Sequence, residues 1–420
     1  MSLTQLALAY ARRRPLSTML VILLLAVGTA VVALTLVLTR ELETRLHRDA
    51  EGIDLVVGAK GSPLQLVLAA VYHVDVPPGN IPLDAIAALR AEPLIASVIP
   101  LALGDSFRGY RIVGTKASLV DHYRARLAAG SLWSAPMEAV IGSDVARATG
   151  LAVGATFAGS HGMAEAGAEH ANAPYRVVGV LDRSGSVVDR LVLTSVDSVW
   201  AVHDTHHGKE GADEDHDAEA GNAAARGAQA GGGHADDGRA REVTMALVRY
   251  AGPLAAATLP RKINSDTNLV AASPAYETAR LLSVFGVGVD LVRAFAYLLI
   301  AASALMLFVA LAQALDERRY DLAILRALGA HRAQIAWVLV AESLVLALAG
   351  AVLGLLLAHA LLAVLAQTVT AAAPLAGAAT TFRPEEAIVA GLAIVAGILS
   401  AAWPAWQAYR LDVAATLADS

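Results

Sequence analysis

The sequence predicts an α+β membrane protein with four transmembrane helices and a large mixed α/β extracytoplasmic domain between helices 1 and 2. Three observations favour this class. Of the 420 residues, 56% are hydrophobic and 17% are charged, with a mean hydropathy of +0.55, whereas soluble domains carry about 25% charged residues. Four apolar segments are each long enough to cross the roughly 30 Å core of a bilayer. The first two are separated by about 250 residues, enough for one domain or two subdomains.

The predicted spans follow from runs of about 20 apolar residues. Leu16–Thr39 and Ala294–Leu315 contain no charged residue, and the third run holds one acid, Glu342, near its start. A cleaved signal peptide is the alternative for the first run, but this run is longer than a signal core of about 7–15 residues. We therefore expect an uncleaved anchor. The predicted spans are residues 16–39, 291–315, 335–365 and 387–407.

Arginines orient these spans, because short loops rich in Lys and Arg remain in the cytoplasm. Arg12–Arg14 precede the first span, Arg410 follows the fourth, and the loop 316–334 carries four arginines. We therefore expect both termini inside the cell. The predicted cytoplasmic segments are residues 1–15, 316–334 and 408–420, and the predicted outer segments are residues 40–290 and 366–386.

The outer segment 40–290 shows a mixture of helical and strand patterns. Glu138–Phe157 is typical of a strand, a helix, a glycine stop and a second strand. Alternation and β-branched residues predict further strands, and helical periodicity predicts a continuation of the first span and a helix leading into the second. The strands are expected at Tyr175–Leu181, Arg190–Ser195 and Val243–Tyr250, and the helices at Arg40–Asp49, Val196–His203 and Pro274–Phe285.

The apolar stretch Ser62–Pro82 allows more than one interpretation. It is too short and too interrupted for a fifth span. A buried core helix is the more common explanation, and a contact with lipid, a lipoprotein or another protein is the alternative.

A short amphipathic helix is predicted in the loop between the second and third spans. Tyr320, Ile324, Ala327 and Leu328 recur at helical spacing and form one apolar stripe, and Gly329 follows as a helix-ending residue. Periodicity leaves three interpretations open. The helix lies in the headgroup layer, it only turns the chain, or its stripe docks into a groove on a partner.

The segment ERRYDLAILRALGAHRAQI (Glu317–Ile335), followed by LVAESLVLALAGAVLGLLLAHAL, closely resembles the FtsX/MacB-type permease domain of ABC transporters. EAVIGSDVARATGLAVG, YRVVGVLDRSGSVVDRLVLTS and the final PAWQAYRLDVAATLA extend the resemblance over most of the chain. One departure is Asp412-Val413, where family members often have Asp-Pro.

The resemblance implies that the predicted short helix is a coupling helix, which contacts a separate ABC ATP-binding subunit. It also implies a homodimer of permease copies in the bacterial inner membrane, and an outer domain that is moved by the ATPase cycle and acts on a periplasmic or lipoprotein partner. The implied contact residues are Glu317, Arg318, Arg319, Tyr320, Asp321, Ile324, Leu325, Arg326, Leu328 and Gly329.

Several functions are disfavoured by the residues themselves. The sequence contains no G-x-x-x-x-G-K-[ST] phosphate-binding loop, so we expect no enzymatic activity, no cofactor in this chain, and ATP only on the partner subunit. Outside residues 203–237 the charge is close to neutral, which predicts no nucleic-acid binding. Four spans without an inverted repeat also disfavour a secondary transporter.

Three residues or residue pairs inside the predicted spans stand out. Glu342 lies about two turns into its helix, within reach of the interface or of a basic neighbour, and is expected to have a structural or coupling role rather than to relay protons. Gly350 and Gly354 favour either close helix packing or simple tolerance of glycine in membrane helices. His359, a single histidine, is assigned no role.

The window 203–237 is rich in histidine and acids and is expected to be a disordered insertion in the outer domain. Imidazole with carboxylates suits zinc, but no rigid ligand spacing is present, so weak capture at several sites and a plain solvated loop both remain open. The candidate metal ligands are His203, His206, His207, His216 and His234.

Three functions therefore compete. The first is a permease subunit that couples a separate ATPase to an envelope substrate. The second is a component of zinc transport or homeostasis that uses the His-rich loop, and the third is a regulator of a periplasmic hydrolase that transports nothing.

Overall fold

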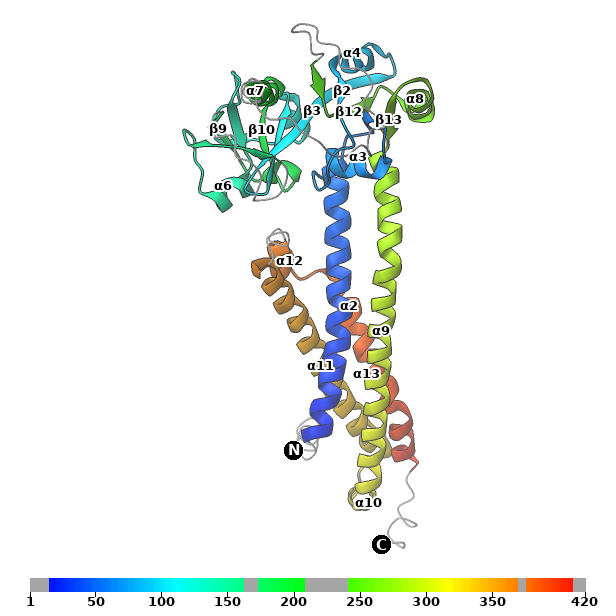
Figure 1. Ribbon diagram of the computed structural model, residues 1–420. Helices are drawn as coiled ribbons and strands as arrows, with labels where there is room; N and C mark the ends of the chain where they lie inside the picture. Colours follow the sequence, from blue (N-terminus) through cyan, green and yellow to red (C-terminus); the bar gives the residue numbers. More distant parts are fainter. Residues whose placement is uncertain (1–14, 162–172, 208–240, 369–374, 411–420) are drawn as a thin grey trace, which may run out of the picture. The chain divides into compact units, whose positions relative to one another are not determined.

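The computed structural model describes residues 15–161, 173–207, 241–368 and 375–410. The chain divides into two compact units. One, the helical unit, ends at Thr44 and resumes at Leu282, and the other, the sheet unit, is Arg45–Leu281. The boundaries fall inside two long helices, which continue from one unit into the other (Figure 1).

Four helices are long and apolar enough to cross a membrane, by length and composition, among the residues described. Together with the sheet unit between the first and second of them in sequence, they confirm the predicted fold class. Two shorter helices, α10 (Arg319–Ala327) and α12 (Ala376–Thr380), lie in the connections between them. The four long helices are α2 (Pro15–Ala50), α9 (Pro274–Glu317), α11 (Arg332–Thr368) and α13 (Pro384–Tyr409).

Glycines allow the helices of the helical unit to approach closely. A Cβ placed on Gly354 of α11 would lie 2.6 Å from the carbonyl oxygen of Ala26 and 2.7 Å from the Cβ of Thr29, both in α2. A Cβ on Gly350 would meet the side chain of Leu25 at 2.8 Å. Of the two explanations for this glycine pair, the structure supports close packing, since an alanine at either place would collide with α2.

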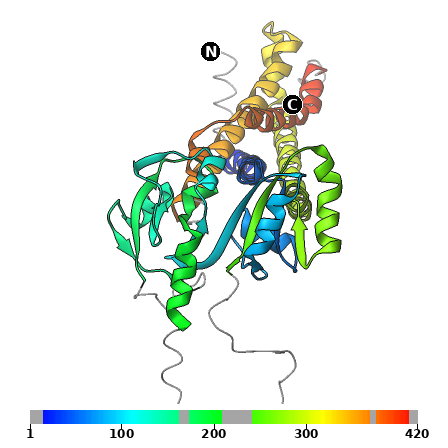
Figure 2. The same ribbon diagram turned by 90° about the horizontal axis from the view of Figure 1, so that it is seen from above.

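The sheet unit is built on an 11-stranded sheet with the order β13-β1-β12-β3-β4-β10-β6-β9-β5, onto which β7 and β8 pair at the side. The long strand β3 runs through both halves, because its first part pairs with β12 and its second part with β4 (Figures 1 and 2). The principal strands are β1 (Leu55–Ala59), β3 (Ile95–Phe107), β4 (Tyr110–Thr115), β5 (Leu127–Gly130), β6 (Glu138–Ile141), β9 (Tyr175–Leu181), β10 (Val192–Ser195), β12 (Met245–Tyr250) and β13 (Leu269–Ala272).

Helices cover both faces of the half that contains β1 and β12. Leu55 and Val57 belong to the hydrophobic cluster that contains residues of α4 (Leu83–Ala91) and α8 (Pro253–Asp266). Val56, between them, belongs to the cluster that contains residues of α3 (Pro63–Ala70). Because successive side chains of a strand point to opposite faces, one strand contributes to two cores. This explains why β1 is apolar throughout.

The other half follows the predicted pattern closely. After β6 come α6 (Ser143–Thr149), Gly150 with φ 72° at its end, and the short strand β7 (Thr156–Phe157). The strand predicted from Arg190 begins at Val192, because a 3₁₀ turn occupies Val187–Arg190. The helix predicted at its end is α7 (Val196–His207). The hairpin of β3 and β4, which turns at Arg108 and Gly109, was not predicted.

The apolar stretch Ser62–Pro82 begins with a core helix of the sheet unit. Ser62 accepts a hydrogen bond from the backbone of Gln65, and Pro63 occupies the first turn, so the helix α3 starts there. Leu66 and Val67 are fully buried. The more common of the two interpretations is therefore confirmed for this helix.

Candidate functional site

The helix α10, between the second and third long helices, has a well-defined end. The backbone N–H of Gly329 donates to the carbonyl of Arg326, and the N–H of Ala330 donates to the carbonyl of Leu325. This pair of bonds satisfies the last carbonyls of a helix and requires a positive φ at the residue after the cap. Gly329 has φ 103°, as its predicted position after the helix requires.

The two faces of α10 differ in their surroundings. Leu322 and Ala323 are buried in the helical unit, and Leu322 belongs to a cluster with residues of α2, α9, α11 and α13. The predicted apolar stripe points the other way, since Tyr320 is 50% exposed and Leu328 is 79% exposed. One apolar face therefore packs α10 against the helical unit, and a second apolar face remains exposed.

An ion pair fixes the start of α10 against α11. Arg318, the residue before the helix, has its Nη1 atom 3.2 Å from Oε2 of Glu342. Both side chains are largely buried, at 13% and 8% exposure. Of the two possibilities for Glu342, the interface or a basic neighbour, the structure shows a basic neighbour, Arg318.

The predicted contact residues all lie on this one segment. Glu317 ends α9, Arg318 and Leu328 flank α10, and Gly329 follows it. Arg319 pairs with Asp316 at 2.9 Å on the surface. Within α10 the exposed members are Arg319, Tyr320, Asp321, Ile324 and Leu325, and Arg326 is half-buried.

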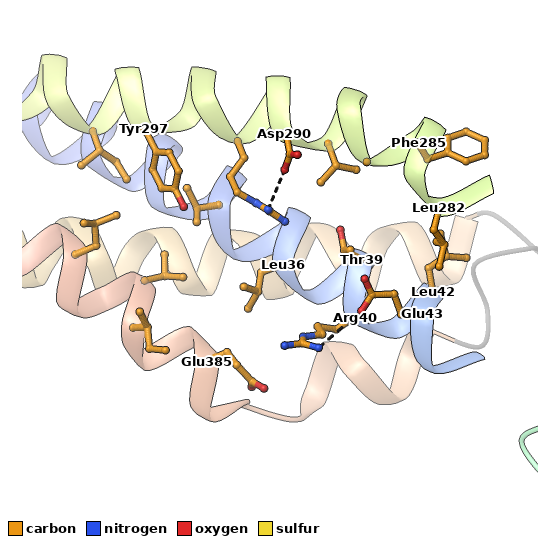
Figure 3. Close-up of a pocket in the computed structure, with 18 of the residues that line it drawn as sticks. Leu36, Thr39, Arg40, Leu42, Glu43, Leu282, Phe285, Asp290, Tyr297 and Glu385 are labelled. Carbon is orange, nitrogen blue, oxygen red and sulfur yellow. Dashed lines mark hydrogen bonds and ion pairs between the residues drawn. The ribbon is translucent and has the colours of Figure 1, made fainter. Parts of the chain in front are cut away.

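A groove of about 1100 Å³ lies elsewhere in the helical unit, between α2, α9 and α13 (Figure 3). Val32, Ile300 and Leu392 belong to its mostly apolar lining. Its charged lining residues form two ion pairs, Arg40 with Glu43 at 3.7 Å and Asp290 with Arg293 at 3.2 Å. The sequence did not predict this groove, because it forms between helices whose packing no local pattern specifies.

The candidate metal ligands are only partly within the described residues. His203, His206 and His207 lie in the last turns of α7, whereas His216 and His234 fall outside the described residues. Among the side chains that the structure describes, no group of three or more His, Asp or Glu could hold a metal ion.

One polar contact was missed by the sequence. His359, to which no role was assigned, has its Nε2 atom 2.8 Å from the buried carboxylate of Glu386. The available signal was the position of a histidine and an acid at the two ends of one short interhelical connection.

Two family models match the chain. The model described as MacB-like periplasmic core domain matches residues 18–226, and the model described as FtsX-like permease C-terminal matches residues 293–413. No curated protein sequence matches the chain.

Two solved structures show a weak likeness. One is the periplasmic region of MacB from Actinobacillus actinomycetemcomitans, with 12% identity and a TM-score of 0.34 over 58% of this chain and 97% of that one. The other is the extracellular domain of the noncanonic ABC-type transporter YknZ from Gram-positive bacteria, with 11% identity and a TM-score of 0.29 over 52% of this chain and 98% of that one.

The two family models together match most of the chain. The first covers most of α2 and most of the sheet unit, and the second begins within α9 and includes α10, α11 and α13. With four candidate membrane helices and the mixed sheet between the first two, the chain belongs to the FtsX/MacB-type ABC transporter permease family.

Proposed function

We propose that this chain is the membrane subunit that couples ATP hydrolysis by a separate ATPase subunit to movement of its extracytoplasmic domain. The observation that carries the proposal is α10, a short helix with one apolar face buried and a second apolar face exposed. The domain acts on an envelope substrate or partner rather than on a nucleotide. ATP is bound by the partner subunit.

The exposed stripe of α10 supports docking over the two other interpretations. A helix that only turns the chain needs no second apolar face, yet Leu328 and Tyr320 are exposed. The ion pair Arg318–Glu342 and the buried Leu322 hold the helix against the bundle. A helix that is held rigidly and presents apolar anchors at helical spacing suits a groove on a partner protein.

The long helices support mechanical transmission. α2 has 36 residues and α9 has 44, so at 1.5 Å per residue they reach about 54 and 66 Å, well beyond the bilayer core of roughly 30 Å. Each helix is continuous from the membrane-spanning part into the sheet unit. A displacement that begins near α10, at the end of α9, can therefore travel along a hydrogen-bonded rod.

Several further assignments belong to this proposal. Two permease copies form a homodimer in the bacterial inner membrane, both termini lie in the cytoplasm, and the sheet unit meets a periplasmic or lipoprotein partner. Residues 1–14 and 411–420, on which part of the orientation depends, lie outside the described residues. The arginines of the loop 316–334 support the same orientation.

Photo-crosslinking in living cells tests the docking of α10. A benzophenone amino acid replaces Leu328, on the exposed stripe, and in a matched control it replaces Leu356, which is 62% exposed in the middle of α11. We expect a crosslink from Leu328 to a protein with an ATP-binding phosphate loop, identified by mass spectrometry, and none from Leu356. Crosslinks to lipid alone from both positions would support a headgroup helix instead.

A second candidate function is zinc transport or homeostasis through the His-rich loop. The observation that favours it is the composition of residues 203–237, which hold five histidines and nine acids. Imidazole is a common zinc ligand, and carboxylates can complete the shell. Calorimetric titration of the full-length protein with zinc, with and without residues 203–237, tests it. Binding that is lost with the deletion supports the site, and equal or absent binding in both forms removes it.

A third candidate is a regulator that activates a periplasmic hydrolase and moves nothing across the membrane. It shares the coupling through α10 and differs only in what the outer domain contacts. Reconstituted complexes that hydrolyse ATP, activate a hydrolase and leave every candidate substrate in place would favour it.

A further inference from the structure

Both ring nitrogens of His359, near the end of α11, have polar partners. Nε2 lies 2.8 Å from Oε2 of Glu386, in the first turn of α13, and Nδ1 lies 3.1 Å from the carbonyl oxygen of Ala379 in α12. The side chain of Glu386 is fully buried and that of His359 is 20% exposed. One imidazole ring therefore joins α11 to both α12 and α13.

These contacts determine how many protons the pair holds. A carbonyl oxygen only accepts, so the hydrogen bond to Ala379 places a hydrogen on Nδ1 of His359. Between Nε2 and the carboxylate of Glu386 there is then one proton, whether an imidazolium donates it or the acid donates it to a neutral ring. If this proton leaves, a nitrogen lone pair faces carboxylate oxygens. This hydrogen bond is then lost, whereas a second proton on the carboxyl group leaves one of its oxygens able to accept from Nε2–H.

Beside His359 and Glu386 there is little space for a water molecule that could replace a lost hydrogen bond. Ala33, Leu34 and Val37 of α2, with Leu362 of α11, line a gap beside the pair of only about 10 Å³. A cavity needs about 10–15 Å³ to hold one water molecule. The pair is thus packed against apolar side chains, where an unsatisfied polar group is costly.

A second ion pair continues the contacts to α2. Arg383, immediately before α13, has its Nη2 atom 2.7 Å from Oε2 of Glu41. The backbone N–H of Arg383 donates to Oε1 of Glu386 at 3.3 Å. Through Glu386, a continuous set of polar contacts links α2, α13, α12 and α11.

The other charged side chains of the helices packed around His359 and Glu386 line the groove or pair with other residues. Arg40 and Glu43 of α2 and Glu385 of α13 line the groove of Figure 3. The described part of α12 has no titratable side chain. The other acid of α11, Glu342, lies about 25 Å away along that helix and pairs with Arg318. The ring of Phe382, with its centroid 6.4 Å from that of His359, also covers the imidazole.

We propose that His359 and Glu386 form a proton-operated latch. With one proton between them they hold the ends of α11, α12 and α13 together, and loss of that proton releases this end of the bundle. The latch rests on the proposed function in one respect, the assignment of α12 to the outer side, which makes the external pH the signal. His359 lies about 40 Å along α11 from Arg332, the first residue of that helix, so the latch would control the end of the bundle opposite the ATPase contact.

Spin labelling tests the latch on the purified full-length permease, without any ATPase. The chain contains no cysteine, so one label can be placed at Thr381→Cys, the exposed residue that follows α12. A matched control label is placed at Leu356→Cys, on an exposed face of α11. The mobility of each label is recorded by electron paramagnetic resonance over a range of pH, in the native background and with His359→Gln, whose side chain does not titrate.

We expect the mobile fraction of the label at Thr381→Cys to at least double when the pH is raised until the pair loses its shared proton. With His359→Gln this pH dependence disappears, and the label at Leu356→Cys shows none in either background. A pH-independent spectrum in the native background, or an equal pH dependence with His359→Gln, would overturn the latch. If His359→Gln does not fold, Glu386→Gln provides the same comparison. Because no ATPase is present, failure here leaves the coupling through α10 untouched.

Discussion

Arg318 and Glu342 lie 24 residues apart in the chain and meet as a buried ion pair, with 3.2 Å between Nη1 and Oε2. The pair joins the residue before α10 to the third long helix. Its burial matters, because removing one partner leaves an uncompensated charge in surroundings that cannot solvate it. The orientation of the proposed coupling helix therefore depends on two charges as well as on its buried apolar face.

Removal of one partner is expected to destabilise the helical unit strongly. Glu342→Ala should lower the free energy of unfolding by about 3–5 kcal/mol, the usual cost of breaking a buried pair. Arg319→Ala is the matched control, because Arg319 pairs with Asp316 on the surface, where both side chains are more than half exposed, and exposed pairs contribute at most ~1 kcal/mol. Thermal unfolding in detergent compares the two variants. Equal losses of stability would show that the buried pair is no more important than a surface pair.

Exchange of the two charges gives a second test of the same pair. Arg318→Glu combined with Glu342→Arg should recover part of the stability that each single substitution loses, because the interaction is restored with its direction reversed. A double variant as unstable as the sum of the single ones would argue that each residue acts through other contacts.

The close approach of α11 to α2 leads to a packing prediction. Gly354→Ala should destabilise the protein, since its Cβ would lie 2.6 Å from the backbone oxygen of Ala26, and overpacking costs about 1–3 kcal/mol. Gly391→Ala, in α13, is the control, because nothing lies within 4 Å of a Cβ there. It should be neutral or stabilise by up to about 1 kcal/mol through helix propensity. The measurement is again thermal unfolding, and a harmless Gly354→Ala would contradict this packing.

The buried His73 makes the sheet unit sensitive to acid. Burial, with a smaller contribution from Arg111 and Arg190, lowers the pKa of His73 from 6.5 to about 3. The unfolded chain therefore binds a proton at this residue below about pH 6.5, where the folded protein does not. Stability should fall as the pH drops from 6.5 towards 3, by as much as ~1.4 kcal/mol per pH unit from this group.

His73→Asn isolates this contribution. His73 has φ 55°, and asparagine tolerates this left-handed conformation better than most residues. Unfolding temperatures at neutral and acidic pH should fall less steeply in the variant than in the native protein, whose other titrating groups are unchanged. Parallel pH profiles would mean that His73 takes up its proton in the folded state as readily as in the unfolded one.

The fold was predictable wherever local physics decides it. The four long helices followed from apolar length, because the bilayer sets how many residues a span needs. The end of α10 followed from Gly329, since a positive φ after a helix favours glycine. Strand β9 was predicted with its observed ends by alternation and β-branched content.

The polar pairs were not predictable as pairs. A basic neighbour was one of two possibilities for Glu342, and Arg326 and Arg332 are closer to it in sequence than Arg318, which helix packing selects. His359 and Glu386 lie 27 residues apart, and their positions on either side of one connection do not specify that the two side chains meet. The groove between α2, α9 and α13 likewise depends on tertiary packing.

The central claim is that α10 transmits the ATPase cycle, and ATP hydrolysis by the purified complex tests it most directly. The complex is reconstituted in lipid nanodiscs with the native permease, with Ile324→Glu on the exposed stripe, or with His331→Gln, which changes an exposed polar residue after the helix and outside the predicted contact residues. We expect stimulation of ATP hydrolysis by the permease to be lost with Ile324→Glu and kept with His331→Gln, with both variants folded. Full stimulation by the Ile324→Glu permease would contradict the account.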